Sequence, residues 1–167
     1  MRKKLNQKAL DKTDLQILNI LQENSRLSYR KIAAKMGISG VMASARIKNL
    51  EDKGFLKCYT TRLDSAKLGY DLTAVIFVQI EGEYLKNLSN ELSQMANVVA
   101  VYEVTGDFDI AALVKLKDRE SLNTLLKELL ITPHIRKTVT NIALNVVKED
   151  FNIHLPVSLG QKKDFVQ

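Results

Sequence analysis

The sequence predicts an α+β protein in which an N-terminal winged helix-turn-helix is joined to a C-terminal ferredoxin-like βαββαβ domain. Three observations indicate this fold class. The first part of the chain contains three helix-like segments, with a short glycine turn before the third. The pattern changes to alternating apolar residues at Leu72. Finally, residues 1–70 hold 15 Lys and Arg against 6 Asp and Glu, whereas residues 71–167 hold 10 against 13.

Composition sets further limits on the function. The net charge of the 167 residues is +6 and the isoelectric point is about 9.4, and the asymmetry of charge favours a nucleic-acid module joined to something else. Cys58 is the sole cysteine, so no internal disulfide and no Cys/His zinc cluster is expected. The basic start has no apolar core after it, and no apolar run approaches the roughly 20 residues of a membrane helix, so we expect a cytoplasmic protein.

Each helix of the first domain has start and stop signals of its own. Asp11 is a plausible N-cap for the first helix, because its side chain can accept a hydrogen bond from an unpaired amide of the first turn. Ser28 and Ser39 can cap the second and third helices in the same way. Gly37 and Gly54 suit the left-handed position at which helices end, so they are expected to terminate the second and third helices.

The three helices are typical of a helix-turn-helix, and the loosely alternating Phe55–Leu63 is expected to add the strand of the wing. In such a domain the third helix enters the major groove, which is about 12 Å wide. Its apolar positions Ala43, Ile47 and Leu50 point inward, which leaves the opposite face for DNA. The residues expected to contact DNA are Ser28, Arg30, Lys31, Ser39, Gly40, Val41, Ser44, Arg46 and Lys48, with Lys57 and Arg62 as further candidates.

The expected readout of base sequence is thin. Near the start of the third helix, Ser39 and Ser44 can hydrogen-bond to base edges, and Val41 can pack on a thymine methyl group. We therefore expect affinity to depend on phosphate contacts, with modest sequence specificity aided by DNA bending. The alternative is a helical hairpin whose charged side chains face water and contact no DNA. We favour DNA binding because the helices, the turn and the local positive charge agree.

The second domain is expected to have the element order βαββαβ. The expected strands are residues 72–80, 98–105, 109–116 and 136–147, and the expected helices are residues 84–95 and 118–132. This order is typical of a ferredoxin-like arrangement, in which both helices cover one face of the sheet. The strands are apolar on both faces, so the uncovered face predicts dimerisation sheet to sheet.

The turn Val104–Asp109 combines a glycine with two acids. Its backbone N–H groups could hold a carboxylate while an Asp holds an ammonium group, as an amino acid would require. An ordinary hairpin turn is the alternative, and the spacing alone favours it.

Support for catalysis is weak. His134 and His154 have no nucleophile pattern nearby, and an exposed loop position is expected for His134. Asp107 and Asp109 could be imagined as an acid pair, but nothing else surrounds them, and no glycine-rich phosphate loop is present. The sequence therefore predicts a protein that is not an enzyme and that has no catalytic or metal-binding residues and no cofactor.

Three stretches of the chain form a pattern together: LDKTDLQILNILQENSRLSYRKIAAKMGIS (10–39), RIKNLEDKGFLKCYTTRLDSAKLG (46–69) and VYEVTGDFDI (101–110). Jointly they resemble the Lrp/AsnC (feast/famine) family of bacterial and archaeal transcription regulators. The resemblance implies a RAM/ACT-like effector domain, dimers that often form octamers of four dimers, and a small amino acid bound between effector domains of neighbouring dimers. The effector residues that it implies are Thr105, Gly106, Asp107 and Asp109 of the turn, with Thr138 and Thr140 of the last strand.

The sequence thus predicts a sequence-selective, amino-acid-responsive DNA-binding transcription regulator. The expected parts are a winged helix-turn-helix over residues 1–63, a linker over 64–71, the effector and oligomerisation domain over 72–150 and a C-terminal tail over 151–167. Two alternatives stay open. One is an enzyme of the sirohaem-decarboxylase type, which shares this build, although the basic N-terminal domain argues against it. The other is a chromatin-like protein that coats DNA and ignores small molecules.

Overall fold

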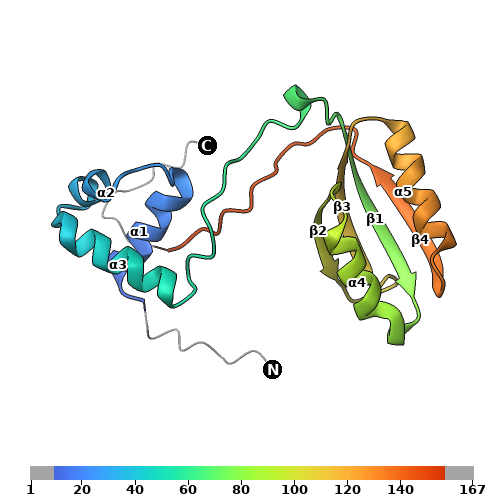
Figure 1. Ribbon diagram of the computed structural model, residues 1–167, viewed down its shortest axis with the longest axis horizontal. Coiled ribbons are helices and arrows are strands. Elements are labelled where there is room, and N and C mark those ends of the chain that lie inside the picture. The colour runs from blue at the N-terminus through green and yellow to red at the C-terminus, as the bar shows by residue number, and fades with distance from the viewer. Residues whose placement is uncertain (1–9, 157–167) are drawn as a thin grey trace, which may run out of the picture. The chain divides into compact units, whose positions relative to one another are not determined.

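The computed structural model describes residues 10–156, which divide into two compact units (Figure 1). Unit 1 comprises residues 10–62 together with 150–156, and unit 2 comprises residues 63–149. The C-terminal segment after residue 149 therefore belongs to the same unit as the N-terminal helices. Within residues 10–156, no helix is long and apolar enough to cross a membrane.

Unit 1 contains three helices, α1 (Lys12–Glu23), α2 (Tyr29–Met36) and α3 (Gly40–Asp52). Their predicted starts are confirmed, since the side chain of each N-cap residue accepts a hydrogen bond from a first-turn amide. Both predicted glycine stops are also confirmed, with φ near 70° at each. The helices enclose a small core of Ile17, Leu18, Leu21, Ile32, Ile47 and Leu50.

The strand predicted at Phe55–Leu63 is wrong. Phe55 and Leu56 instead donate their amides to the carbonyl of Leu50, 2.9 and 3.2 Å away, and pack against the core of unit 1. Residues 57–64 then run without regular secondary structure. A strand needs a neighbour for its amide and carbonyl groups, and within residues 10–156 no strand pairs with this segment.

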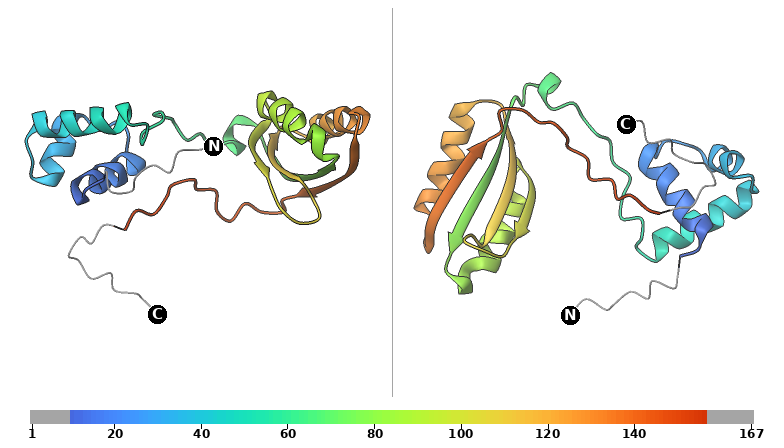
Figure 2. Two further views of the ribbon diagram at one scale, coloured as in Figure 1. Left: turned by 90° about the horizontal axis from the view of Figure 1, so that it is seen from below. Right: turned by 180° about the vertical axis from the view of Figure 1, so that it is seen from behind.

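Unit 2 is a four-stranded antiparallel sheet with two helices. Its elements are η2 (Ala66–Leu68), β1 (Leu72–Ile80), η3 (Gly82–Tyr84), α4 (Leu85–Gln94), β2 (Val98–Glu103), β3 (Ile110–Leu116), α5 (Arg119–Ile131) and β4 (Ile135–Ile142). The strand order β2-β3-β1-β4 confirms the predicted ferredoxin-like topology. Figure 2 shows that both helices cover the same face of the sheet.

The last strand is shorter than the predicted 136–147. Strand β4 ends at Ile142, which pairs with Ala74, and one further amide, that of Ala143, donates to the carbonyl of Thr73 at 2.9 Å. Its partner β1 begins at Leu72, so later residues of the C-terminal segment have no strand beside them in this sheet.

The two faces of the sheet differ in what covers them. The helix-covered face carries the core of unit 2, which includes Ala74, Ile76, Val78, Ile80, Leu88, Leu92, Ile110, Val114, Leu116, Leu122, Leu125 and Leu129. Because side chains alternate along a strand, the register places another apolar set on the outer face. This outer face comprises Val75, Phe77, Ala100, Tyr102, Ala111, Leu113 and Val139. No helix of unit 2 covers it (Figure 2).

Candidate DNA-binding and effector sites

The turn between α2 and α3 is built as the sequence predicts. Gly37 adopts φ 66°, and the next amide, that of Ile38, donates to the carbonyl of Ala33 at 3.1 Å. Ser39 then starts α3, with its Oγ accepting a hydrogen bond from the amide of Met42 at 3.1 Å. The serine predicted to read bases therefore also fixes the start of the helix. Its hydroxyl hydrogen is left to donate.

The outward face of α3 is exposed along its length. Ala43, Ile47 and Leu50 are fully buried, as predicted, while Val41 is 82% exposed. Lys48 is exposed, and Ser44 is half-buried. The predicted set lacks Asn49, an exposed amide side chain two helical turns beyond Val41. The spacing of Val41, Ala45 and Asn49, four residues apart, is the signal that could have found it.

Arg46 lies in a different environment from the one predicted. Its Nη1 contacts Asp11 Oδ2 at 2.6 Å and Asp14 Oδ1 at 2.9 Å. Asp14 is 5% exposed, and these two acids also form the capping box of α1. Hydrogen bonds to Asp11 and then Asp14 raise the pKa of Arg46, while the backbone amide of Asp14, followed by Arg46, lowers the pKa of Asp11. The guanidinium therefore ties α3 to the start of α1.

Other basic side chains differ in how far they are engaged. Arg30, Lys31, Lys48 and Lys57 are exposed, and within residues 10–156 none of them forms an ion pair. Arg62, a further candidate for phosphate contact, is paired with Asp150 at 2.9 Å. The free basic charge of the described part of unit 1 thus includes the start of α2 and the outer face of α3.

The predicted effector turn connects β2 to β3. Gly106 adopts φ 116°, a backbone conformation that a residue with a Cβ atom rarely takes, and the residues from Thr105 to Asp107 are exposed. The amide of Val104 donates to the carbonyl of Asp109 at 2.9 Å and closes the turn.

The two acids of the turn have different surroundings. Asp109 Oδ2 accepts a hydrogen bond from the amide of Ile80 at 2.8 Å, and the amide of Asp109 donates to the carbonyl of Val78 at 2.9 Å. Asp109 is therefore committed to holding the turn against β1. Asp107 is exposed and has no hydrogen bond or ion pair within the described residues, so its carboxylate can accept a ligand.

Thr138 and Thr140 lie on the other side of β1 from this turn. The register pairs them with Val78 and Ile76, so their side chains are half-buried on the helix-covered side of the sheet. Within one chain, β1 separates the threonines from the turn, because Asp109 bonds to one edge of Val78 and Thr138 pairs across the other. One chain does not bring the six predicted effector residues into one enclosed site.

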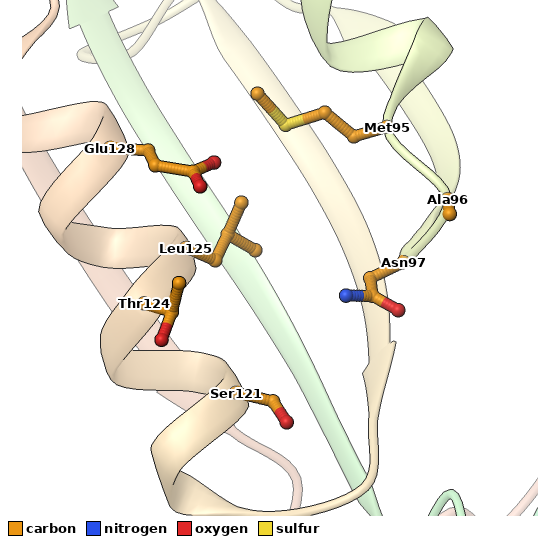
Figure 3. Close-up of a pocket in the computed structure, with 7 residues that line it drawn as sticks. All are labelled: Met95, Ala96, Asn97, Ser121, Thr124, Leu125 and Glu128. Carbon is orange, nitrogen blue, oxygen red and sulfur yellow. The ribbon is translucent and has the colours of Figure 1, made fainter.

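Two cavities of unit 2 lie beside its helices. A cavity of about 420 Å³ lies between the end of α4 and α5 (Figure 3) and is lined by Met95, Ala96, Asn97, Ser121, Thr124, Leu125 and Glu128. None of these is a predicted effector residue. A smaller cavity of about 230 Å³ includes Ile80, whose amide is bonded to Asp109, so this cavity borders the residues that hold the turn.

His134 is an exposed loop residue, as predicted, and it also lines the smaller cavity. It adopts φ 69°, which is uncommon for a residue with a side chain. Its ring stacks on Tyr84 with centroids 3.5 Å apart, and its Nδ1 lies 3.3 Å from Glu81 Oε2. Its carbonyl accepts a hydrogen bond from the amide of Glu81. These contacts fix the entry to β4 in the left-handed conformation.

A helix-turn-helix unit with a free basic surface, joined to a ferredoxin-like unit, is typical of a DNA-binding transcription regulator. The chain matches a winged helix-turn-helix DNA-binding domain over residues 10–57 and the Lrp/AsnC ligand-binding domain over residues 73–153. The protein belongs to the Lrp/AsnC family. The family and the relatives below are transcription regulators, so the chain is a regulator and not an enzyme.

Similar proteins support this membership at full length. An uncharacterised HTH-type transcriptional regulator of Pyrococcus furiosus is 40% identical over 144 residues, which are 86% of this chain and 97% of that protein. The crystal structure of a Neisseria meningitidis regulator in complex with L-Met has a TM-score of 0.82 at 25% identity and covers 90% of this chain and 98% of its own. An AsnC family regulator of Agrobacterium tumefaciens has a TM-score of 0.81 at 27% identity and covers 87% and 97%.

Proposed function

We propose that this regulator binds a small amino acid at the turn 104–109 and that binding changes its assembly or its affinity for DNA. The observation that carries the proposal is that the two acids of the turn, Asp107 and Asp109, differ in their contacts. Asp109 holds the turn, while Asp107 is left with a free, exposed carboxylate beside the backbone of Gly106. A carboxylate next to exposed amides suits the two charges of an amino acid. The match to a ligand-binding domain and the L-Met complex of the Neisseria meningitidis relative support it.

A second copy of the chain would complete this site. The turn is exposed, and neither cavity described above is lined by one of the six predicted residues. We therefore propose that dimers form through the outer face of the sheet, and that the effector lies where the turn of one effector domain meets a neighbouring dimer. Thr138 and Thr140 are proposed to contribute from β4.

A thermal-shift screen against the common amino acids tests the effector site. A ligand at about 100 times its dissociation constant stabilises by roughly 2.7 kcal/mol, which moves the midpoint by several degrees. We expect one or two amino acids to stabilise the wild type, and Asp107→Asn to lose that shift without a change in its own midpoint. Asp71→Asn, a change at another exposed acid of unit 2, is the matched control. If the amino acid raises the midpoint of Asp107→Asn as much as that of the wild type, the turn does not bind the effector.

We further propose that DNA lies against the outer face of α3. Its contacts would come from Ser28, Arg30, Lys31, Ser39, Gly40, Val41, Ser44 and Lys48, to which the exposed position of Asn49 adds one amide. Arg46 is proposed to position α3 rather than to contact phosphate, because both of its acid partners already occupy the guanidinium.

The salt dependence of DNA binding tests this assignment. Each phosphate contact contributes about 0.9 to the slope of log affinity against log salt concentration. Lys31→Ala and Lys48→Ala are each expected to lower the slope by about one and to weaken binding to all sequences alike. Lys86→Ala, at an exposed lysine on α4, should leave the slope unchanged. If the wild type and the three variants have equal salt slopes, DNA does not contact Lys31 or Lys48.

A further inference from the structure

The segment 150–156 packs on α1 as an extended strap. Gln22 forms two hydrogen bonds with the backbone of the strap. Its Nε2 donates to the carbonyl of Ile153 at 3.1 Å, and the amide of Ile153 donates to its Oε1 at 2.8 Å. Asn19, three residues earlier on the same helix face, donates from Nδ2 to the carbonyl of Leu155 at 3.2 Å. Two amide side chains of one helix thus bind the main chain of the strap.

An apolar anchor accompanies these polar contacts. Leu155 is half-buried and packs against the core of unit 1. By contrast, Leu144 and Val147, earlier in the same C-terminal segment, are almost fully exposed. Main-chain hydrogen bonds with one apolar side chain in a pocket are the contacts by which proteins bind extended peptides. The face of α1 with Asn19 and Gln22 therefore binds an extended peptide, and that peptide is the chain's own strap.

Ion pairs fix the segments that enter and leave each unit. Within unit 1, Arg62 pairs with Asp150, which joins the first residue of the strap to the end of the N-terminal part. Within unit 2, Lys115 Nζ lies 2.9 Å from Glu149 Oε2 and 3.1 Å from Ser65 Oγ. The lysine side chain is 17% exposed, and it holds both segments through which unit 2 continues into unit 1.

We propose that the strap is a latch: docked on α1, it gives the DNA-binding unit a second connection to the effector domain and restrains its orientation. The chain crosses between the units twice, at residues 62–63 and at 149–150. The second crossing connects the two units only while the strap is docked on α1. A unit held by two connections loses less orientational freedom when it binds DNA, so release of the latch weakens binding. The strap follows β4 in the chain after residues 143–149, so it leads from the effector domain to α1.

Two neutral substitutions release the latch. Leu155→Ser removes the apolar anchor, and Gln22→Met removes both hydrogen bonds to Ile153 with little change of shape or helix propensity. Each has a matched control, Leu144→Ser at an exposed position of the C-terminal segment and Gln16→Met on α1. None of the four changes the net charge, so phosphate contacts are not altered directly.

Hydrogen exchange by mass spectrometry and DNA affinity are measured on all five full-length proteins. In the wild type and the controls, the peptide that contains Ile153 should be protected, because the amide of Ile153 donates to Gln22. In the two release variants, that protection should be lost while α2 and α3 stay protected, and the dissociation constant for DNA should rise at least fivefold with an unchanged salt slope. A strap that exchanges freely in the wild type would overturn the latch, as would release variants that bind DNA as tightly as the controls. Neither readout depends on an amino acid effector.

Discussion

Phe77→Asp is expected to dissociate the protein into monomers and to weaken DNA binding by roughly two orders of magnitude or more. Phe77 lies in the outer face of the sheet, beside Ala111 on β3 and Val139 on β4, and its ring lies 5.5 Å from that of Phe108. A charge there would be desolvated when a second sheet packs against it. Two linked DNA-binding units can exceed the affinity of one by a factor of about 10² to 10⁴, which dissociation would remove.

Analytical ultracentrifugation and DNA titration measure this effect together. Leu130→Asp, at an exposed leucine of α5 on the helix-covered side of the sheet, is the matched control and should keep the wild-type mass. Ala111→Glu places a charge on the same face from β3 and should reproduce the dissociation. If both outer-face variants keep the wild-type mass and affinity, the dimer does not form through this face.

Arg46→Met should destabilise unit 1 by about 2 kcal/mol and leave the salt slope of DNA binding unchanged. The substitution keeps the aliphatic stem but leaves Asp14, which is 5% exposed, without its guanidinium partner. A buried polar group that loses its partner costs about 1–3 kcal/mol, and a broken, fully buried ion pair costs about 3–5 kcal/mol. Because the Arg46 side chain is 31% exposed, we expect an effect in the lower of these ranges.

A double-mutant cycle with Asp14→Asn separates this ion pair from other effects of the substitution. The two changes should be markedly non-additive, because the loss of either partner already breaks the pair. Since the pKa of Asp11 is lowered in the folded state, its share of the stabilisation is present near neutral pH and is lost as the pH falls through that lowered pKa. If the salt slope of DNA binding drops by about one in Arg46→Met, Arg46 contacts a DNA phosphate after all.

The sequence predicts most of the fold because its signals are local. Asp11, Ser28 and Ser39 cap helices through amides three residues away, and the alternation of β1 marks its buried face directly. The errors concern features set by distant partners. Phe55–Leu63 alternates like a strand but has none beside it, and β4 ends because β1 begins at Leu72.

The candidate sites divide in the same way. Gly106 and the exposure of Asp107 follow from the turn pattern itself. The partners of Arg46 lie 32 and 35 residues away in the sequence, and Gln22 meets Ile153 across 131 residues. From the sequence alone, an arginine on a helix predicted to bind DNA is interpreted as a phosphate contact, because its acid partners are distant in the chain. The residues of the strap likewise contain no pattern that predicts binding by Asn19 and Gln22.

We expect an amino acid to change how this regulator binds DNA, and one titration tests this directly. A preferred DNA duplex is first selected from a random pool with the full-length protein. Its dissociation constant is then measured by fluorescence anisotropy without effector and with each common amino acid in turn. We expect the dissociation constant to change at least fivefold with one or two amino acids, and not to change for Asp107→Asn. Identical dissociation constants throughout the panel would contradict this expectation and would favour a protein that coats DNA without regard to amino acids.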